Sequence, residues 1–157
     1  MKFLTGETEK TIKELMGKYE DPRSALLPIL HTVQRDYGYI SKEAIEEISE
    51  ILDIPKVEIK GVITFYSMLR EKPAGKYHIQ LCRNVACYLN GGKELVEFLE
   101  KEYGLKPGTF TDNMKFSLSL VECIGQCEIA PAVQINDKFY GNLTPKKLKE
   151  ILSKLEG

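Results

Sequence analysis

The chain is poor in the features that mark nucleic-acid-binding, membrane-spanning and secreted proteins. Its 22 lysine and arginine residues are balanced by 23 aspartate and glutamate residues, and the formal net charge of −1 excludes a basic surface for nucleic acid. No apolar run approaches the roughly 20 residues that a helix needs to span a bilayer. The first residues, MKFLTGE, contain no apolar signal-peptide segment. We therefore expect a cytoplasmic or organelle-matrix protein, soluble or peripheral to a membrane complex, without direct membrane insertion.

The sequence also lacks the short motifs of nucleotide binding and acid–base catalysis. No Gly-x-Gly-x-x-Gly follows a predicted strand, no phosphate-binding loop occurs, and no Ser/His/Asp or His-Glu-x-x-His pattern is present. The chain therefore offers no dinucleotide site and no acid–base pair. Any chemistry on a substrate must take place in another chain.

Cysteine is scarce, and its four occurrences form two close pairs. The pairs are Cys82-x4-Cys87 and Cys123-x3-Cys127, separated by a long intervening segment. A thiolate is a soft ligand, and four thiolates suit an iron–sulfur cluster or a structural zinc ion. Four cysteines can ligate one [2Fe–2S] or one [4Fe–4S] cluster, and the spacing alone leaves that choice open.

Other uses of the cysteines differ in how well they fit. Structural zinc suits the short pair spacings, although the middle segment exceeds the usual zinc-ribbon spacing. Two disulfides are possible, in any of three connectivities, but a reducing compartment argues against them. A thioredoxin-type dithiol requires Cys-x-x-Cys, which is absent. Rieske ligation requires two histidines, and neither His31 nor His78 lies within a cysteine motif.

The first half of the chain predicts four short amphipathic helices packed as a small bundle. Apolar stripes over residues 12–19 and 26–37 predict the first two helices, with Thr8 as the N-cap of the first. Ser41 caps a third helix, and Pro55 opens a fourth. The residues expected to face inward from the fourth helix are Val57, Val62 and Phe65.

At residues 71–76 the helical spacing of apolar residues changes to an alternation of apolar and polar residues, which predicts strands. Strands over 77–81 and 116–121 each run toward a cysteine pair, a helix over 93–103 lies between them, and a hairpin over 133–140 precedes a last helix capped by Thr144. This β-α-β-β-α order is that of a thioredoxin-like fold. We therefore predict an α+β protein, with an N-terminal helical bundle (1–70) followed by a thioredoxin-like α/β domain (75–157) carrying an iron–sulfur cluster.

The segments around the cysteines resemble a known family. Residues 76–82 (KYHIQLC) with Cys87, and residues 123–136 (CIGQCEIAPAVQIN), are similar to the [2Fe–2S] ferredoxins of thioredoxin-like fold. More closely, the chain resembles the small [2Fe–2S] subunit of the NADH dehydrogenase module of complex I. Related subunits occur in NAD-linked hydrogenases, including electron-bifurcating ones, and in formate dehydrogenases. Residues 30–41 and 61–68 match as well, so the resemblance covers nearly the whole chain.

The resemblance implies one [2Fe–2S] cluster held by Cys82, Cys87, Cys123 and Cys127. It also implies one-electron transfer beside a larger flavoprotein subunit that binds FMN and NAD(H) and carries its own iron–sulfur cluster. The chain would be a non-catalytic electron-transfer subunit of a multi-subunit NAD(H)-linked oxidoreductase, with the helical bundle as a docking element. The alternatives are a zinc-stabilised interaction module without redox activity and a free-standing ferredoxin. The helical half argues against the ferredoxin, because a simple carrier needs only the second domain.

Several residues near the cysteines are candidates to modulate a cluster. Gly125 lets backbone N–H groups approach a sulfur atom, and such hydrogen bonds help to set the reduction potential. Gln126 departs from the family pattern, and residues 83–86 form a segment that the family leaves variable. Arg83 either offsets the negative charge of a thiolate cluster or faces solvent or a partner.

Three further expectations concern residues away from the ligand set. We expect His78 to be a hydrogen-bonded histidine of the sheet and His31 to be structural or interfacial. Pro131 precedes a strand and is expected to follow a cis peptide bond, as thioredoxin-like folds often show. Phe65 and Tyr66 are expected to pack in the helical core rather than to dock a partner.

Overall fold

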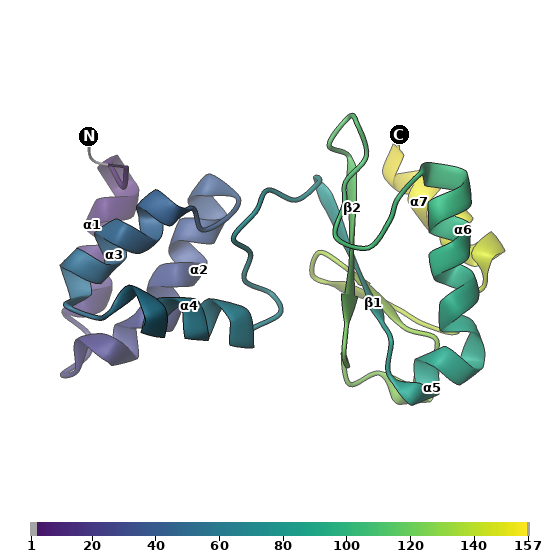
Figure 1. The fold of residues 1–157 in the computed structure, drawn as a ribbon, viewed down its shortest axis with the longest axis horizontal. Helices are drawn as coiled ribbons and strands as arrows, with labels where there is room; N and C mark the ends of the chain where they lie inside the picture. Colours follow the sequence, from purple (N-terminus) through teal and green to yellow (C-terminus); the bar gives the residue numbers. More distant parts are fainter. Residues whose placement is uncertain (1–2, 157) are drawn as a thin grey trace. The chain divides into compact units, whose positions relative to one another are not determined.

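The computed structural model describes residues 3–156, and the chain divides into two compact units between Pro73 and Ala74 (Figure 1). The first unit is helical, and the second combines helices with a four-stranded mixed sheet. The predicted α+β class is confirmed. Within residues 3–156 no helix is both long and apolar enough to cross a membrane.

The first unit is built from short helices whose ends follow local sequence signals. Gly38 closes α2 in a left-handed conformation with φ of 82°. The Ser41 side chain accepts a hydrogen bond from the Ala44 N–H at 3.2 Å and caps α3, as predicted. The elements are α1 (Gly6–Met16), a 3-10 turn η1 (Pro22–Ala25), α2 (Leu26–Tyr37), α3 (Lys42–Leu52) and α4 (Lys56–Phe65).

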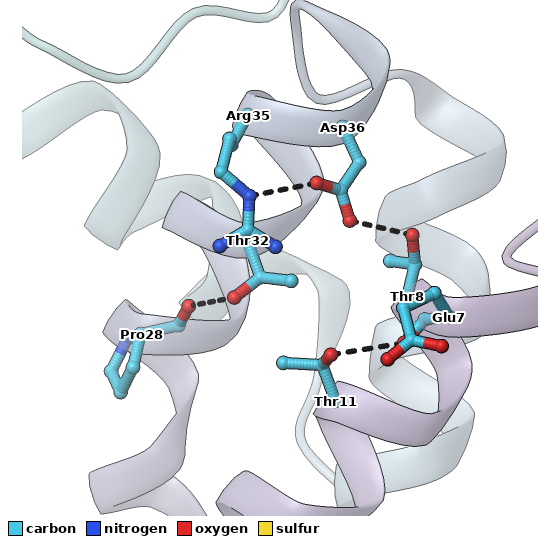
Figure 2. A network of polar contacts seen from close by, with 7 residues as sticks. All are labelled: Glu7, Thr8, Thr11, Pro28, Thr32, Arg35 and Asp36. Atoms are coloured by element: carbon cyan, nitrogen blue, oxygen red, sulfur yellow. Dashed lines mark hydrogen bonds and ion pairs between the residues drawn. The ribbon is translucent and has the colours of Figure 1, made fainter.

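The start of α1 differs from the prediction that Thr8 caps it. The helix begins at Gly6, and Thr8 lies buried within its first turn. The Thr8 hydroxyl donates a hydrogen bond to Asp36 Oδ2 at 2.6 Å, and Arg35 Nε donates to Asp36 Oδ1 at 2.8 Å (Figure 2). A threonine hydroxyl can cap a helix or donate a hydrogen bond to a neighbouring helix. Here it donates to the Asp36 carboxylate of α2.

Helix α4 turns a different face inward from the predicted one. Ile59 and Ile63, one turn apart, are its buried residues. Val57 and Phe65, which we expected to face inward, are exposed. Residues 56–65 are apolar on more than one face, so periodicity alone selected the wrong stripe.

The core of the first unit is aliphatic and draws on all of its helices. Val62 and Tyr66 pack against this core, as predicted, whereas Phe65 does not. The fully or nearly fully buried residues are Leu4, Ile12, Ala25, Leu26, Ile29, Leu30, Val33, Ile40, Ala44, Ile45, Ile48, Leu52, Ile54, Ile59, Ile63 and Leu69.

The second unit has the predicted β-α-β-β-α order. Its sheet has the strand order β2-β1-β3-β4, in which β1 and β2 are parallel and the other neighbours antiparallel. Helices α6 and α7 lie on the same side of this sheet (Figure 1). The elements are β1 (Tyr77–Cys82), α5 (Val85–Cys87), a π-helical turn η2 (Tyr88–Gly92), α6 (Lys93–Tyr103), β2 (Phe116–Val121), η3 (Cys127–Ile129), β3 (Val133–Ile135), β4 (Lys138–Tyr140) and α7 (Pro145–Glu156).

A second hydrophobic core fills the space between the sheet and its two long helices. Gly104 ends α6 in a left-handed conformation, and the Thr144 hydroxyl accepts the Lys147 N–H at 3.3 Å at the start of α7, as predicted. The buried residues are Ile79, Leu81, Leu95, Leu99, Leu105, Phe116, Leu118, Val133, Ile135, Leu143, Leu148 and Leu152.

Candidate metal centre

The parallel strands β1 and β2 bring both cysteine pairs to one edge of the sheet. Cys82 is the last residue of β1 and lies opposite Val121, the last residue of β2. The Arg83 N–H donates to the Val121 carbonyl at 2.9 Å, so the pairing continues past the strand ends. Cys82 Sγ lies 3.8 Å from the carbonyl oxygen of Glu122, the residue immediately before Cys123. Because the carboxyl ends of parallel strands share one edge, Cys123 emerges beside Cys82 although the two are far apart in sequence.

The first cysteine pair is buried. Cys82 and Cys87 are 2% and 1% exposed, and they form a small apolar cluster with Ala132. The Cys82 N–H donates to the Ala132 carbonyl at 3.3 Å, which ties this cluster to the segment before β3. Ile124 and Ala130, both partly buried, pack against this cluster.

This burial affects the protonation of Cys87. Burial raises the pKa of the Cys87 thiol, and the adjacent Cys82 thiol raises it further, while a hydrogen bond from the Ala132 backbone lowers it. A thiolate in this position is therefore stabilised mainly when a nearby cation compensates its charge. Metal ligation supplies that compensation, because the ligand binds as the thiolate.

The second cysteine pair is exposed. Cys123 lies in the loop after β2, and Cys127 begins η3. The Gly125 N–H donates to Cys123 Sγ at 3.3 Å, which is the contact expected from the sequence. Gly125 has φ of +69°, and no atom lies within 4 Å of the position that a Cβ would occupy. Conformation rather than crowding thus favours glycine here.

The four predicted ligands are arranged as pairs. None of the four forms a disulfide. Cys82 and Cys87 interact with each other, and Cys127 lies close enough to Cys87 to influence its pKa. Across residues 3–156, no three His, Cys, Asp or Glu side chains are gathered closely enough to hold one metal ion. A [2Fe–2S] cluster takes thiolate ligands, two on each iron, and the two cysteine pairs are donors of this kind.

The sequence reasoning missed Gly92. A Cβ at this position would lie 2.8 Å from the Cys87 carbonyl oxygen, closer than real Cβ atoms come. Gly91, with φ of 100°, lies at a kink within η2. Two consecutive glycines before a helix were the available signal for a close approach next to Cys87.

Arg83 is engaged within the chain. Its Nε donates to Glu122 Oε1 at 2.9 Å, and the pair joins the residues that follow β1 and β2. The arginine lowers the pKa of the Glu122 carboxyl below its usual value. Both side chains are exposed, and their charges largely offset each other beside the cysteines.

Two smaller predictions are confirmed. His78 is buried in β1, and its Nδ1 forms a hydrogen bond with Ser117 Oγ at 2.8 Å across the sheet. The peptide bond between Ala130 and Pro131 is cis.

The chain is similar to proteins of NADH-quinone oxidoreductases. It is 38% identical over 141 residues to an NADH-quinone oxidoreductase subunit of Rhizobium meliloti, in a match that covers 90% of this chain and 84% of the relative. It is 41% identical over 147 residues to an NADH-quinone oxidoreductase subunit of Rickettsia conorii, covering 92% of this chain and 88% of the relative.

Among solved structures, a chain of an NAD+-reducing [NiFe]-hydrogenase in the air-oxidized state shares the fold. The TM-score is 0.70 at 24% identity, over 83% of this chain and 22% of the hydrogenase chain. The family model for the thioredoxin-like [2Fe–2S] ferredoxins matches residues 12–156, which include parts of both units and all four cysteines. The chain belongs to the thioredoxin-like [2Fe–2S] ferredoxin family.

Proposed function

We propose that this chain is the electron-transfer subunit of a multi-subunit NAD(H)-linked oxidoreductase and holds one [2Fe–2S] cluster at Cys82, Cys87, Cys123 and Cys127. The observation that supports the proposal is that Cys82 ends β1 beside the loop that carries Cys123, in a member of this family. When bound, such a cluster takes up and releases one electron at a time.

The protein contributes ligands, hydrogen bonds and burial. Cys82 and Cys87 hold the buried side of the site, and Cys123 and Cys127 hold the exposed side. The Gly125 N–H at Cys123 Sγ and the Ala132 backbone hydrogen bond at Cys87 both favour added negative charge on sulfur. One side of the site is therefore sealed from water, while the other is open for electron exchange with a partner.

We propose that the partner is a larger flavoprotein subunit that binds FMN and NAD(H) and carries its own iron–sulfur cluster. The curated relatives are named as subunits of NADH-quinone oxidoreductases, which supports a place in a complex of this type. The chain has no dinucleotide-binding motif, so hydride chemistry is assigned to the partner and this subunit is non-catalytic. A complex of the NADH:quinone oxidoreductase or NAD-linked hydrogenase type fits these features.

The test is the visible absorption and electron paramagnetic resonance of the anaerobically purified chain before and after dithionite. We expect a red-brown protein with two irons and two acid-labile sulfides per chain, which bleaches partly and becomes paramagnetic on one-electron reduction. A colourless protein with one zinc per chain would overturn the electron-transfer function and favour the zinc-stabilised module. Failure to copurify with any FMN-containing subunit, with the cluster intact, would favour a free-standing ferredoxin.

A further inference from the structure

An ion pair links the residues that adjoin one cysteine of each pair. Arg83 directly follows Cys82 at the end of β1, and Glu122 directly precedes Cys123 after the end of β2. Arg83 Nε donates to Glu122 Oε1 at 2.9 Å, and Arg83 Nη2 donates to the same oxygen. The ion pair therefore spans the two strand ends next to one proposed ligand from each pair.

Cys123 is exposed, and its loop is held by contacts on either side of it. Ile124, the next residue, packs against the buried cysteine cluster. On the other side, Cys82 Sγ donates to the Glu122 carbonyl at 3.8 Å, which is a weak contact because a thiol is a poor donor. The hydrogen bond from the Gly125 N–H to Cys123 Sγ is internal to the loop. The ion pair adds a charge-assisted link to β1, which is stronger than the contact with the thiol.

Cys127, the other exposed cysteine, is anchored in a different way. It begins η3, and the Ala130 N–H donates to its carbonyl at 3.3 Å. The Asn142 N–H donates to the Ile129 carbonyl at 2.6 Å, which fastens η3 to the segment after β4. Backbone hydrogen bonds thus hold the position of Cys127, whereas the position of Cys123 depends more on the side chains beside it.

The backbone around the ion pair is already ordered by the sheet. The Arg83 N–H donates to the Val121 carbonyl at 2.9 Å, so the strand ends are fixed before the two side chains meet. Forming the pair therefore orders only side-chain rotamers. The Arg83 and Glu122 side chains are 57% and 75% exposed, so screening by solvent keeps the contribution of the pair modest.

We propose that Arg83 and Glu122 are positioning residues, which hold Cys123 beside Cys82 so that a cluster keeps ligands from both cysteine pairs. This role rests on the proposed function, because it concerns retention of the [2Fe–2S] cluster. Removing either partner breaks the same link, so both removals should speed the release of the cluster. A direct effect of charge on the cluster has the opposite sign for the two residues, which separates it from positioning.

The test follows the loss of the cluster from the full-length, cluster-containing chain in anaerobic EDTA at low ionic strength, by visible absorption. Arg83→Gln and Glu122→Gln are each expected to speed this loss by about two- to fivefold, the range expected when an exposed ion pair is removed. A swapped variant, with Arg83→Glu and Glu122→Arg together, rebuilds the pair in reverse. It should recover most of the wild-type rate.

Lys149→Gln is the matched control, because it also removes one positive charge from an ion pair of the second unit. Lys149 is 57% exposed, as Arg83 is, and its Nζ lies 3.0 Å from Glu102 Oε2. This pair joins α7 to α6 rather than the strand ends beside the cysteines. The control should lose its cluster at the wild-type rate.

A positioning role also predicts a spectroscopic signature. The electron paramagnetic resonance g values of a reduced cluster depend on the geometry of its ligands. They should shift in Arg83→Gln and in Glu122→Gln and return toward the wild-type values in the swapped variant. An ion pair that only stabilised the fold would leave the g values unchanged.

Several results would overturn the positioning role and leave the proposed function standing, because the wild-type chain still carries its cluster in each of them. These are unchanged rates or g values in both glutamine variants, rates that change in opposite directions, equal acceleration in Lys149→Gln, and a swapped variant that loses its cluster as fast as the single variants. If the wild-type chain carries no iron–sulfur cluster, the proposed function is wrong and the positioning role falls with it.

Discussion

At the scale of single residues, the four cysteines of the site have unequal surroundings. Cys82 and Cys87 are enclosed with Ala132, whereas Cys123 and Cys127 face solvent. Their side chains are nonetheless proposed to share one cluster, so the loss of any one should affect the whole. Burial protects Cys82 and Cys87 from solvent, whereas the cluster itself depends on ligation by all four cysteines.

Replacing Cys82 or Cys123 by alanine should abolish the cluster or leave it too labile to survive purification. In either variant one iron would be left with a single protein ligand, and an iron–sulfur cluster rarely tolerates that loss. Iron and acid-labile sulfide per chain, together with the visible spectrum, measure the result. Tyr88→Phe, a change at an exposed neighbour of Cys87, is the control and should keep full iron content. Wild-type iron in both alanine variants would contradict the four-ligand assignment.

The ion pair beside the cysteines leads to a prediction for the reduction potential. Reduction adds negative charge to the cluster, so Arg83→Gln should lower the potential and Glu122→Gln should raise it. Both side chains are exposed and screened, so each shift should be on the order of 10–40 mV. Redox titration followed by electron paramagnetic resonance measures both values. Shifts of the same sign in the two variants would show that the pair does not act through its charges.

At the scale of elements, the site depends on how β1 and β2 end. Their parallel pairing places Cys82 beside the loop of Cys123, and the η2 turn holds Cys87 against the same edge. The strands were predictable from their alternating polarity, and the helix ends from strong local signals such as Gly38 and Ser41. The η2 turn was not predictable from the sequence, because its shape depends on contacts with Cys87.

Gly92→Ala should destabilise the second unit and reduce cluster content. The new methyl group would meet the Cys87 carbonyl, and forcing an extra carbon into such a site costs about 1–3 kcal/mol. Gly61→Ala is the matched control, since Gly61 lies in α4 with open space around its Cα, and it should stabilise the first unit by up to about 1 kcal/mol. Chemical unfolding and iron content measure both effects. Equal effects of the two substitutions would contradict the close approach at Gly92.

At the scale of the whole molecule, the chain has two units with separate hydrophobic cores. Each core is supplied by its own unit, and every predicted ligand lies in the second. We therefore propose that the units are folding domains with different tasks, docking for the first and electron transfer for the second. This division makes two predictions.

A fragment of residues 74–157 should fold alone and carry the cluster, because it contains the whole sheet, its core and all four cysteines. It should bind the flavoprotein much more weakly than the full chain, because it lacks the first unit, to which we assign docking. Visible spectroscopy and affinity for the FMN-containing subunit measure the two properties separately. A colourless or unfolded fragment would show that the first unit is needed to form the site.

Removing the cluster with a chelator should destabilise one unit only. A ligand that binds the folded state stabilises it, so the second unit should lose more than about 5 °C in unfolding temperature. The first unit, which contains none of the proposed ligands, should keep its transition. Differential scanning calorimetry of the holo and apo proteins distinguishes the two transitions. A single transition that shifts as a whole would contradict independent units.

The sequence by itself determined the α+β class, the order of the main helices and strands and the two cysteine pairs, because each follows from local periodicity, caps or the positions of the cysteines. Only the tertiary structure decided which side of α4 is buried and what Thr8 contacts, because several faces or partners satisfied the local pattern equally. It also decided that Phe65 is exposed and that Cys87 is enclosed, because burial is set by segments distant in sequence.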